Sequence, residues 1–554
     1  IQMPNNTEVL FSEIPYVEKQ RSRFERSFEH KTTISTGQIV PIEVSEVYPG
    51  DTITADFSQV VRMTTPIAPV MDHSALDCYA FFVPNRLIWS HWREFMGENN
   101  TTHWEQPVEY TIPQITSPSG GWNEGSLADY LGMPIGISDI SESALPFRAY
   151  CRIYNDWFVD ENIQDPVNIT LDETTVAGLN KGVGYDYVTD TEKGAYPLYS
   201  SKWKDYFTAC LPAPQCGPSV KIPLGQTAPV VGGPLHNDTT NIYDTTFEGK
   251  ELNWKGTSIN VSGGTVNVGR IEKGYDEVVT ATKAIGLYTD LSEATAATVN
   301  ELRQAFAVQR YYEAIARGGH RYIEQIYSIF GVSSPDARQQ RAEYLGGKRF
   351  PINMDQVLQT SSTDAVSPQG NTSAFSCTVA SDDLCTYSAT EHGYFFIIVT
   401  IRTNHSYQQG IERFWSRKKR LDFYFPQFAN LSEMPVLNKE IYAQGNSVVD
   451  SEGNIIDDQV FGYQEAYADL RYHPNRISGK LRSTATGTLD IWHYGDKYNS
   501  LPHLSPEWIT ETEANVQRTL AVQTEPQFIC DFYIKAIWTR VLPLHSVPGL
   551  MDHH

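Results

Sequence analysis

The sequence has no apolar run long enough to cross a membrane. The longest clear run covers residues 394–399, whereas a membrane helix needs about 20 consecutive apolar residues. The N-terminal residues also lack the charged and then apolar pattern of a secretory signal. We therefore expect neither a membrane-spanning helix nor such a signal.

Cysteine is scarce, with seven residues in a chain of 554, and no C-x-x-C pair occurs. The number is odd, the residues are scattered, and no histidines stand at zinc-ligand spacing beside the closest pairs. These features argue against a disulfide framework and against a zinc site. We expect buried free thiols in a reducing compartment.

Catalytic motifs are also missing. Gly346-Gly347-Lys348 lacks the earlier glycine and the following Ser or Thr of a P-loop. A Ser-x-x-Lys match at residues 201–204 lacks its companion motifs. Asp72-His73 near Asp77, and His91 with Glu94, are interpreted as polar groups satisfied beside a strand and a helix. The sequence thus predicts no active site and no cofactor.

A net charge of −23 argues against the chain as a whole wrapping nucleic acid. Two local clusters are nevertheless basic. One lies near the N-terminus and one in the C-terminal half: Lys19, Arg21, Arg23, Arg26 and Lys31, and Arg413, Arg417, Lys418, Lys419 and Arg420. Such clusters are most often solvated turns or salt-bridging faces.

Strand patterns dominate what is present. The chain is too long for one simple core, so either several domains or one domain with large insertions is expected. Alternating or continuous apolar residues predict strands at 53–57, 76–83, 394–402, 484–494 and 527–538. In the last of these, one face carries Phe528, Cys530, Phe532, Ile534, Ala536 and Trp538. Long connections separate these strands, and such connections usually carry function.

Helical stripes fall inside the connections. Pro146 opens an aromatic stripe that runs to Phe158. A second helix, capped by Asp290 or Ser292, is expected to carry Val299, Leu302, Ala305 and Phe306 and to end at Gly318-Gly319. A third stripe contains Tyr322, Ile323, Ile326 and Phe330 and stops at Gly331. Core packing is the expected role of all three stripes.

A further helix is predicted directly after the strand at 76–83. Proline at position 84 ends the strand, and Gly97 is a plausible C-cap. The apolar residues between them recur at three-to-four spacing: Ile88, Trp89, Trp92, Phe95 and Met96. This hydrophobic segment needs cover, either from its own chain or from a neighbouring subunit.

Residues 227–290 have a polar texture rich in Gly, Thr, Asn and Asp. Inside this segment, Gly263-Gly264 suits a two-residue type I′ turn. The expected hairpin sets Val261 opposite Val266 and Ile259 opposite Val268. Because a lone hairpin is marginal in water, it should pack on the rest of the insertion or on a neighbouring copy.

Three classes of function remain open from the residues alone. The missing active site and the long apolar insertions favour a structural, self-associating protein. A receptor- or glycan-binding β-rich protein, such as a tail adhesin, is the alternative, although repeats and trimer-forming helices are absent. An all-β polysaccharide hydrolase would need two carboxylates at a defined separation in a cleft.

Several long segments resemble one family in the right order. They include "RSRFERSFEHKTT" (21–33), "LPFRAYCRIYNDWFVDENIQDPV" (145–167), "DYFTACLPAPQCGP" (205–218), "GVSSPDARQQRAEYLGG" (331–347) and "RFWSRKKRLDFYFP" (413–426). On these segments the chain resembles the major capsid proteins of the Microviridae, small single-stranded DNA phages, and more closely those of the gokushovirus branch. The resemblance covers nearly the whole chain.

The resemblance implies a mainly β fold, an eight-stranded antiparallel jelly roll with long, partly helical loop insertions. Residues 1–30 would form an internal arm, 31–554 the capsid domain, and about 227–290 an exposed protrusion at the threefold axes that takes part in host attachment. The hairpin of this protrusion would contain Ile259, Val261, Gly263, Gly264, Val266 and Val268. The product would be a T=1 icosahedral virion, assembled in the bacterial cytoplasm.

The resemblance also implies partners. Besides further copies of the chain, these are a small basic internal DNA-binding peptide, the circular single-stranded DNA genome, an internal scaffolding protein during assembly, and a host surface receptor. In that setting Arg21, Arg23 and Arg26 become candidates for contact with DNA. Trp89, Trp92, Phe95 and Met96 become candidates for packing between subunits.

Overall fold

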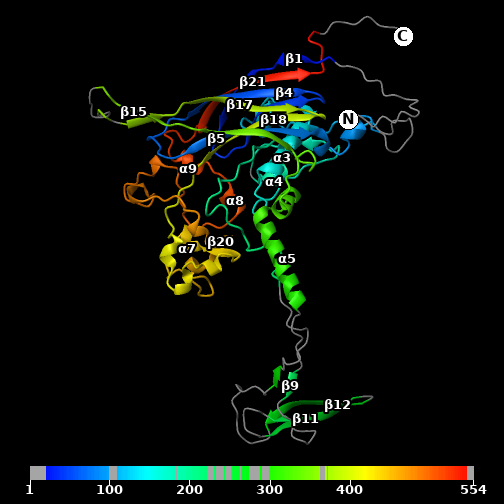
Figure 1. Cartoon of the computed structure of the whole chain (residues 1–554), viewed down its shortest axis with the longest axis vertical. Helices are drawn as coiled ribbons and strands as arrows, with labels where there is room; N and C mark the ends of the chain where they lie inside the picture. The colour runs from blue at the N-terminus through cyan, green and yellow to red at the C-terminus, as the bar shows by residue number, and fades with distance from the viewer. Residues whose placement is uncertain are drawn as a thin grey trace, which may run out of the picture. The chain divides into compact units, whose positions relative to one another are not determined.

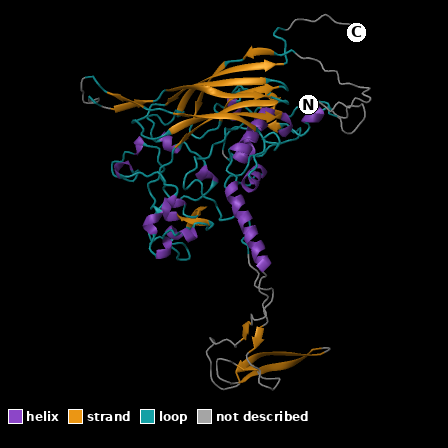
Figure 2. Ribbon diagram, viewed as in Figure 1, coloured by secondary structure: helices purple, strands orange, loops and turns teal. Residues whose placement is uncertain are grey.

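The computed structural model describes residues 20–98, 109–182, 184–220, 299–361, 369–370 and 372–545, together with five short or paired strands between 230 and 289. The chain divides into two compact units. One comprises Ile1–Pro214 and Ala316–His554, and the other Gln215–Ile315. In the first unit, most strands gather into two antiparallel sheets (Figures 1 and 2).

The two sheets interleave as a jelly roll. The first contains β1 (Ser22–Glu25), β2 (Phe28–Ile34), β21 (Phe528–Arg540), β4 (Thr52–Met63) and β17 (Thr378–Ser388), with β1 and β2 both pairing with β21. The second runs in the order β14 (Glu343–Pro351), β5 (Ser74–Pro84), β18 (Gly393–Thr403) and β3 (Val40–Val47). When β1 and β2 are counted as one strand, the eight strands in chain order give sheets 1-8-3-6 and 5-4-7-2. This is the double Greek key of a jelly roll, and it confirms the predicted fold class.

The main core lies between these sheets. The predicted apolar face of β21 is buried there as expected: Phe528, Cys530, Phe532, Ile534, Ala536 and Trp538. Alternate residues of β4, such as Ile53, Ala55 and Phe57, meet it from the neighbouring strand. Strict alternation along each strand sends one face into the core and the other outward.

The strand predictions at 53–57, 76–83 and 394–402 are confirmed as parts of β4, β5 and β18. The prediction at 484–494 is wrong. That segment forms turns and the short 3₁₀ helix η10 (Asp490–Trp492). Gly487 adopts a left-handed φ of 66°, and the hydroxyl of Thr488 donates to the carbonyl of Arg482 at 2.8 Å. These local bonds replace a strand ladder.

The longer insertion joins β5 to β14 and covers the outer face of the second sheet. Its central helix, α3 (Leu145–Trp157), has Pro146 in its first turn as predicted and buries its stripe against Phe81, Val83, Phe396 and Ile398. Its shorter elements in the first unit are β6 (Gln114–Thr116), β7 (Ser141–Ser143), β8 (Val176–Ala177), α2 (Leu127–Tyr130), α4 (Tyr187–Asp190), η2 (Thr191–Lys193), α6 (Tyr322–Gln325) and the π-helical η3 (Ile326–Phe330).

The helix predicted after β5 is split in two. It consists of η1 (Asn85–Leu87) and α1 (Trp92–Phe95), and Gly97 follows with a φ of 95°. Between them, the amide and the hydroxyl of Ser90 both donate to the carbonyl of Leu171 at 2.9 Å. This attachment to another part of the insertion interrupts the helical ladder.

The shorter insertion joins β18 to β21, and its residues Phe461 and Trp508 share a small core with Tyr206 and Phe207 of the longer insertion. Its elements are η4 (Arg413–Ser416), η5 (Arg420–Asp422), η6 (Pro426–Phe428), β19 (Glu433–Leu437), α7 (Asn438–Ile441), η7 (Ile456–Asp458), β20 (Val460–Glu465), η8 (Ala468–Leu470), η9 (Gly479–Leu481), η10, α8 (Pro506–Ile509) and α9 (Ala514–Gln517). A separate pair, β15 (Asp355–Leu358) and β16 (Thr372–Phe375), lies between β14 and β17 in the chain.

The unit Gln215–Ile315 contains the predicted hairpin. Its strands are β9 (Val230–Gly232), β10 (Ile242–Tyr243), β11 (Glu251–Val261), β12 (Gly264–Lys273) and β13 (Leu287–Thr289), and α5 (Val299–Gly318) begins in it. The β11–β12 register pairs Val261 with Gly264 and Ile259 with Val266, so the predicted pairing is wrong by two residues. A shift of two keeps the same residues on alternate positions, so the apolar pattern did not fix the register. Gly263, Asp290 and Ser292 lie outside the described residues.

Candidate functional site

A buried carboxylate on the second sheet is held by two arginines from the adjoining strands. Asp77 of β5 accepts hydrogen bonds from the Nε of Arg349 on β14 at 2.6 Å and from the Nε of Arg402 on β18 at 3.0 Å. The indole of Trp203, whose N–H lies 3.4 Å from Asp77, also sits beneath the Arg349 guanidinium, 4.4 Å from ring centre to Cζ. This cluster ties the longer insertion to the sheet.

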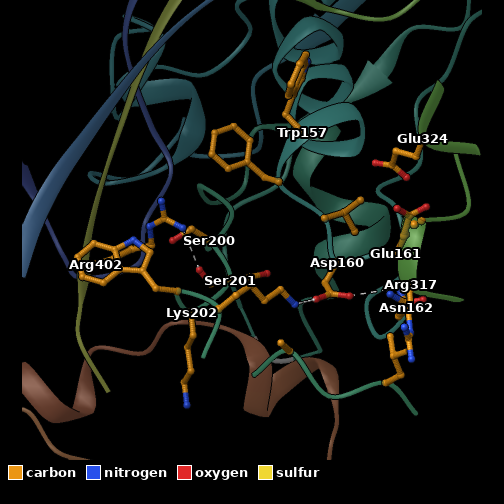
Figure 3. Close-up of a pocket in the computed structure, with 18 of the residues that line it drawn as sticks. Trp157, Asp160, Glu161, Asn162, Ser200, Ser201, Lys202, Arg317, Glu324 and Arg402 are labelled. Atoms are coloured by element: carbon orange, nitrogen blue, oxygen red, sulfur yellow. Dashed lines mark hydrogen bonds and ion pairs between the residues drawn. The ribbon is translucent and has the colours of Figure 1, made fainter. Parts of the chain in front are cut away.

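A cavity of about 760 Å³ opens beside this cluster (Figure 3). Arg402, Ser200 and Ser201 lie on one side of it, and Glu161 and Glu324 lie on the other. The walls therefore carry charges of both signs among aromatic side chains such as Trp157, and the two carboxylates are the feature to test for catalysis.

Glu161 and Glu324 share one arginine. The guanidinium of Arg321 lies 3.1 Å from Glu324 and 3.4 Å from Glu161, and the amide of His320 donates to Glu161 at 3.0 Å. Burial, and then the adjoining Glu324, raise the pKa of Glu161 to about 7. The carboxylates thus hold one proton between them near neutral pH. Arg321 contacts both carboxylates, so the pair links two segments of the longer insertion. It is not the pair of separated carboxylates in a cleft that a polysaccharide hydrolase needs.

The Ser-x-x-Lys match does not form a catalytic pair. The hydroxyl of Ser201 donates to Gln164 at 3.2 Å, while the amino group of Lys204 is paired with Asp160. In the part of the chain that the structure describes, no group of three His, Cys, Asp or Glu side chains is placed to hold a metal ion.

Asp72 and His91, two of the other titratable groups singled out in the sequence, make structural contacts. A carboxylate oxygen of Asp72 accepts from the amide of Tyr494 at 3.0 Å, and His91 pairs with Glu173. Asp77 was expected to be merely satisfied beside a strand. Its partners were missed because they stand 272 and 325 positions away in the sequence, and no local pattern marks them.

A second buried charge cluster was also missed. The two ring nitrogens of His405 lie 3.0 Å from Asp496 and 2.9 Å from Glu511, and Lys202 lies 3.7 Å from Asp496. Burial alone would lower the pKa of His405, but the attraction of both carboxylates outweighs it and raises the pKa to about 10. The same contacts hold the pKa of Asp496 well below its usual range. The imidazolium therefore joins the shorter insertion to the end of β18.

The N-terminal arginines lie along the edge of the first sheet. Arg23 is part of β1, opposite Thr539 of β21, and Arg21 and Arg26 flank this strand. All three side chains are exposed, and the guanidinium of Arg26 lies 4.7 Å from the ring centre of Trp538. Their contact with DNA stays a prediction.

The aromatic cluster after β5 finds most of its cover within its own chain. Trp89 is fully buried, its N–H lies 3.2 Å from Glu173, and its ring centre is 5.1 Å from that of Phe95. Trp92 and Phe95 are partly buried in the same core, whereas Met96 is 48% exposed. Trp89 has no surface left for a neighbour, so packing between subunits stays a prediction for the more exposed members.

The stripe at residues 322–330 is not buried in the core, which corrects the prediction of core packing: Tyr322 and Phe330 are exposed, and Ile323 and Ile326 are only partly buried. Tyr322 is 69% and Phe330 is 74% exposed, and Tyr327 and Val332 beside them are open to solvent as well. Phe306 on α5 is likewise exposed. Only α3 among the three predicted stripes packs as expected. Adjoining apolar side chains of this size mark surfaces that another molecule covers.

Comparison with known proteins decides the class of molecule. The model of a phage capsid protein family, described as capsid protein (F protein), matches residues 12–550. The chain belongs to this family. Across the described residues of this capsid protein, no helix combines the length and apolar character that a membrane span needs.

Three curated relatives agree with the family. The chain is 40% identical to capsid protein VP1 of Spiroplasma virus 4 over 94% of each protein. It is 37% identical to that of Chlamydia phage 1 over 99% of each, and 38% identical to that of Bdellovibrio phage phiMH2K over 97% of each. The resemblance to gokushovirus capsid proteins is confirmed, and so is the prediction of a structural virion component rather than an enzyme.

Proposed function

We propose that this capsid protein associates with copies of itself into a closed T=1 icosahedral shell around circular single-stranded DNA. The observation that carries the proposal is the exposed aromatic surface of residues 322–332 on a subunit whose sheets enclose a buried core. Isolated soluble proteins rarely leave such side chains adjoining and open. In a symmetric shell, each copy can cover a surface of its neighbour.

The net negative charge of the chain opposes the binding of a DNA genome. With a net charge of −23, it supplies few cations to neutralise phosphate. A small basic internal peptide fills this role in the proposal, with Arg21, Arg23 and Arg26 as local contributors. An internal scaffolding protein acts during assembly.

The polar insertion serves host attachment in this proposal. Residues 227–290 lie entirely within the separate unit Gln215–Ile315, in which β11 and β12 pair as an antiparallel hairpin. A separate unit of polar composition suits a protrusion that meets a host receptor. In this proposal Trp89 stabilises the fold of its own subunit, because its side chain is fully buried there, and it makes no contact with a neighbouring subunit.

Nuclease protection of purified particles tests the enclosed genome. Intact particles should protect a DNA that, after extraction, resists exonuclease but is cut by a single-strand-specific endonuclease. Extracted DNA that is linear or double-stranded would contradict the proposal. Particles opened by mild heating before digestion are the control, since their DNA should be degraded.

A further inference from the structure

A loop in the shorter insertion presents an aromatic pair to solvent. We refer to residues 413–424 as the basic aromatic loop; it lies in the lobe that carries α7 and β20 (Figure 1). Trp415 is 71% exposed, and its ring centre lies 4.8 Å from that of Phe414 at an interplanar angle of 35°. An exposed tryptophan backed by a second ring is a platform on which a planar group can stack.

Three consecutive cations follow this platform. Lys418, Lys419 and Arg420 are all exposed, and none of them forms an ion pair within 4.0 Å with another residue that the structure describes. The chain has 66 acidic side chains against 43 Lys and Arg. Three adjacent cations without an ion pair are therefore unexpected in a chain with such an excess of carboxylates. Their charge is left available for an anion from outside the subunit.

The loop is held in place by its other charged residues. Asp422 accepts hydrogen bonds from the backbone amides of Lys418 at 2.8 Å and Lys419 at 2.7 Å. Arg417 is paired with the partly buried Asp469, and its guanidinium lies 5.9 Å from the ring centre of Phe423. Such anchoring reduces the conformational entropy that a ligand would otherwise have to restrict.

A hollow of about 840 Å³ lies against the loop. Its lining includes Trp415 and Lys418 of the loop together with Tyr472 and Arg476. Tyr472 is itself exposed, so the hollow is lined by two exposed aromatic side chains, Trp415 and Tyr472. Its volume is in the range that small-molecule sites occupy, and a nucleotide base fits within it.

We propose that the basic aromatic loop binds single-stranded nucleic acid, with a base stacked on Trp415 and the phosphates of neighbouring nucleotides on Lys418, Lys419 and Arg420. Stacking platforms interleaved with cations are how proteins bind single strands without reading their sequence. The site rests on the proposed function, because it gives the enclosed DNA a contact on the shell.

A second copy of the chain suits this surface less well. Lysine is depleted from the cores of protein interfaces, because burying an ammonium without a matched carboxylate costs stability. A phosphate backbone supplies regularly spaced negative charge, and its bases supply planar faces. A single strand of nucleic acid can therefore contact both the cations and the aromatic rings of the loop.

Binding of fluorescently labelled oligo-dT to purified full-length subunits tests the site, with anisotropy measured over a range of salt concentrations. Each phosphate contact to a single strand contributes about 0.7 to the slope of log K against log salt. The triple variant Lys418→Ala, Lys419→Ala, Arg420→Ala should therefore lower the slope by about 2. Trp415→Ala should weaken binding about tenfold with an unchanged slope, and Trp415→Phe should restore most of it.

Phe375→Ala is the control. This aromatic side chain of β16 is 51% exposed, lies outside the basic aromatic loop, and has no Lys or Arg within three positions in the sequence. The control should bind oligo-dT as the wild type does. Unchanged binding of oligo-dT in the Trp415→Ala and triple variants overturns the proposed site. If these variants bind oligo-dT normally but fail to assemble, the loop belongs to a subunit interface instead. Wild-type particles without DNA contradict the proposed function instead.

Discussion

The Nε of Arg349 lies 2.6 Å from a carboxylate oxygen of Asp77 in the register that pairs β14 with β5. The Asp77 side chain is almost fully buried, and Arg402 contacts it from the other adjoining strand. One carboxylate thus fixes three strands of the second sheet and the wall of the cavity beside it.

Removing this charge should destabilise the subunit. Asp77→Asn keeps the volume but weakens the bonds to Arg349 and Arg402, and we expect a loss of about 2 to 3 kcal/mol in the free energy of unfolding. Urea unfolding of dissociated subunits measures it. Asp56→Asn, which removes an exposed pair with Lys535 at 3.4 Å, is the control and should cost no more than about 1 kcal/mol. Equal losses in both variants would show that burial of Asp77 has no special effect.

The His405 cluster should make stability fall on the alkaline side. The pKa of His405 is raised by Asp496 and Glu511, so its contribution is full below the ordinary value of 6.5 and is lost as the pH rises through about 10. We expect the difference in urea midpoint between wild type and His405→Gln to shrink steadily from pH 7 to pH 10. A difference that stays constant over this range would mean that the imidazole is not charged in the folded subunit.

Glu161 should make the folded subunit less stable as the pH rises towards neutrality. Its pKa is raised to about 7 in the fold, so the stabilising proton is bound below that value and stability declines as the pH rises from 4.5 through 7. Glu161→Gln keeps a neutral group in place. The variant should match the wild type in unfolding midpoint at pH 5 and exceed it at pH 8. An equal midpoint at pH 8 would rule out the shared proton.

Substitutions at Trp89 and Met96 should distinguish an effect on the stability of the subunit from an effect on assembly. Trp89→Ala empties a site in the core of the longer insertion and should cost about 3 to 5 kcal/mol in the free energy of unfolding. Met96→Ala should change this free energy by less than about 0.5 kcal/mol, because the side chain is half exposed. If Met96 packs between subunits, the yield of particles falls in the Met96→Ala variant although its subunits stay as stable as the wild type. A normal yield would remove Met96 from the interface.

Deleting residues 253–274 should leave capsids able to form while attachment to host cells falls. This span contains most of the β11–β12 hairpin in the unit Gln215–Ile315. Particle yield by sedimentation and adsorption of labelled particles to host cells are the two measurements. Loss of assembly would instead place the hairpin within a subunit interface.

Local patterns were enough to predict much of the sandwich. The alternation in β21 and the continuous apolar run of β5 each reflect how one strand is covered, so both could be inferred from the residues themselves. The segment 484–494 shows the limit. It has strand-like residues, but Gly487 and Thr488 satisfy the backbone locally.

Contacts between distant segments could not be predicted in the same way. The partners of Asp77 and His405 come from strands and loops far along the chain, and nothing near either residue marks them. The stripe containing Tyr322 and Phe330 shows a related limit. Its spacing indicates an apolar face that needs cover, but spacing does not distinguish cover by the same chain from cover by another copy.

Electron microscopy of the purified protein, with its internal peptide and scaffolding protein present, tests the central claim most directly. The account predicts closed particles whose reconstruction has icosahedral T=1 symmetry, with the surface of residues 322–332 covered by a neighbouring subunit. A protein that stays monomeric at high concentration under these conditions would contradict it.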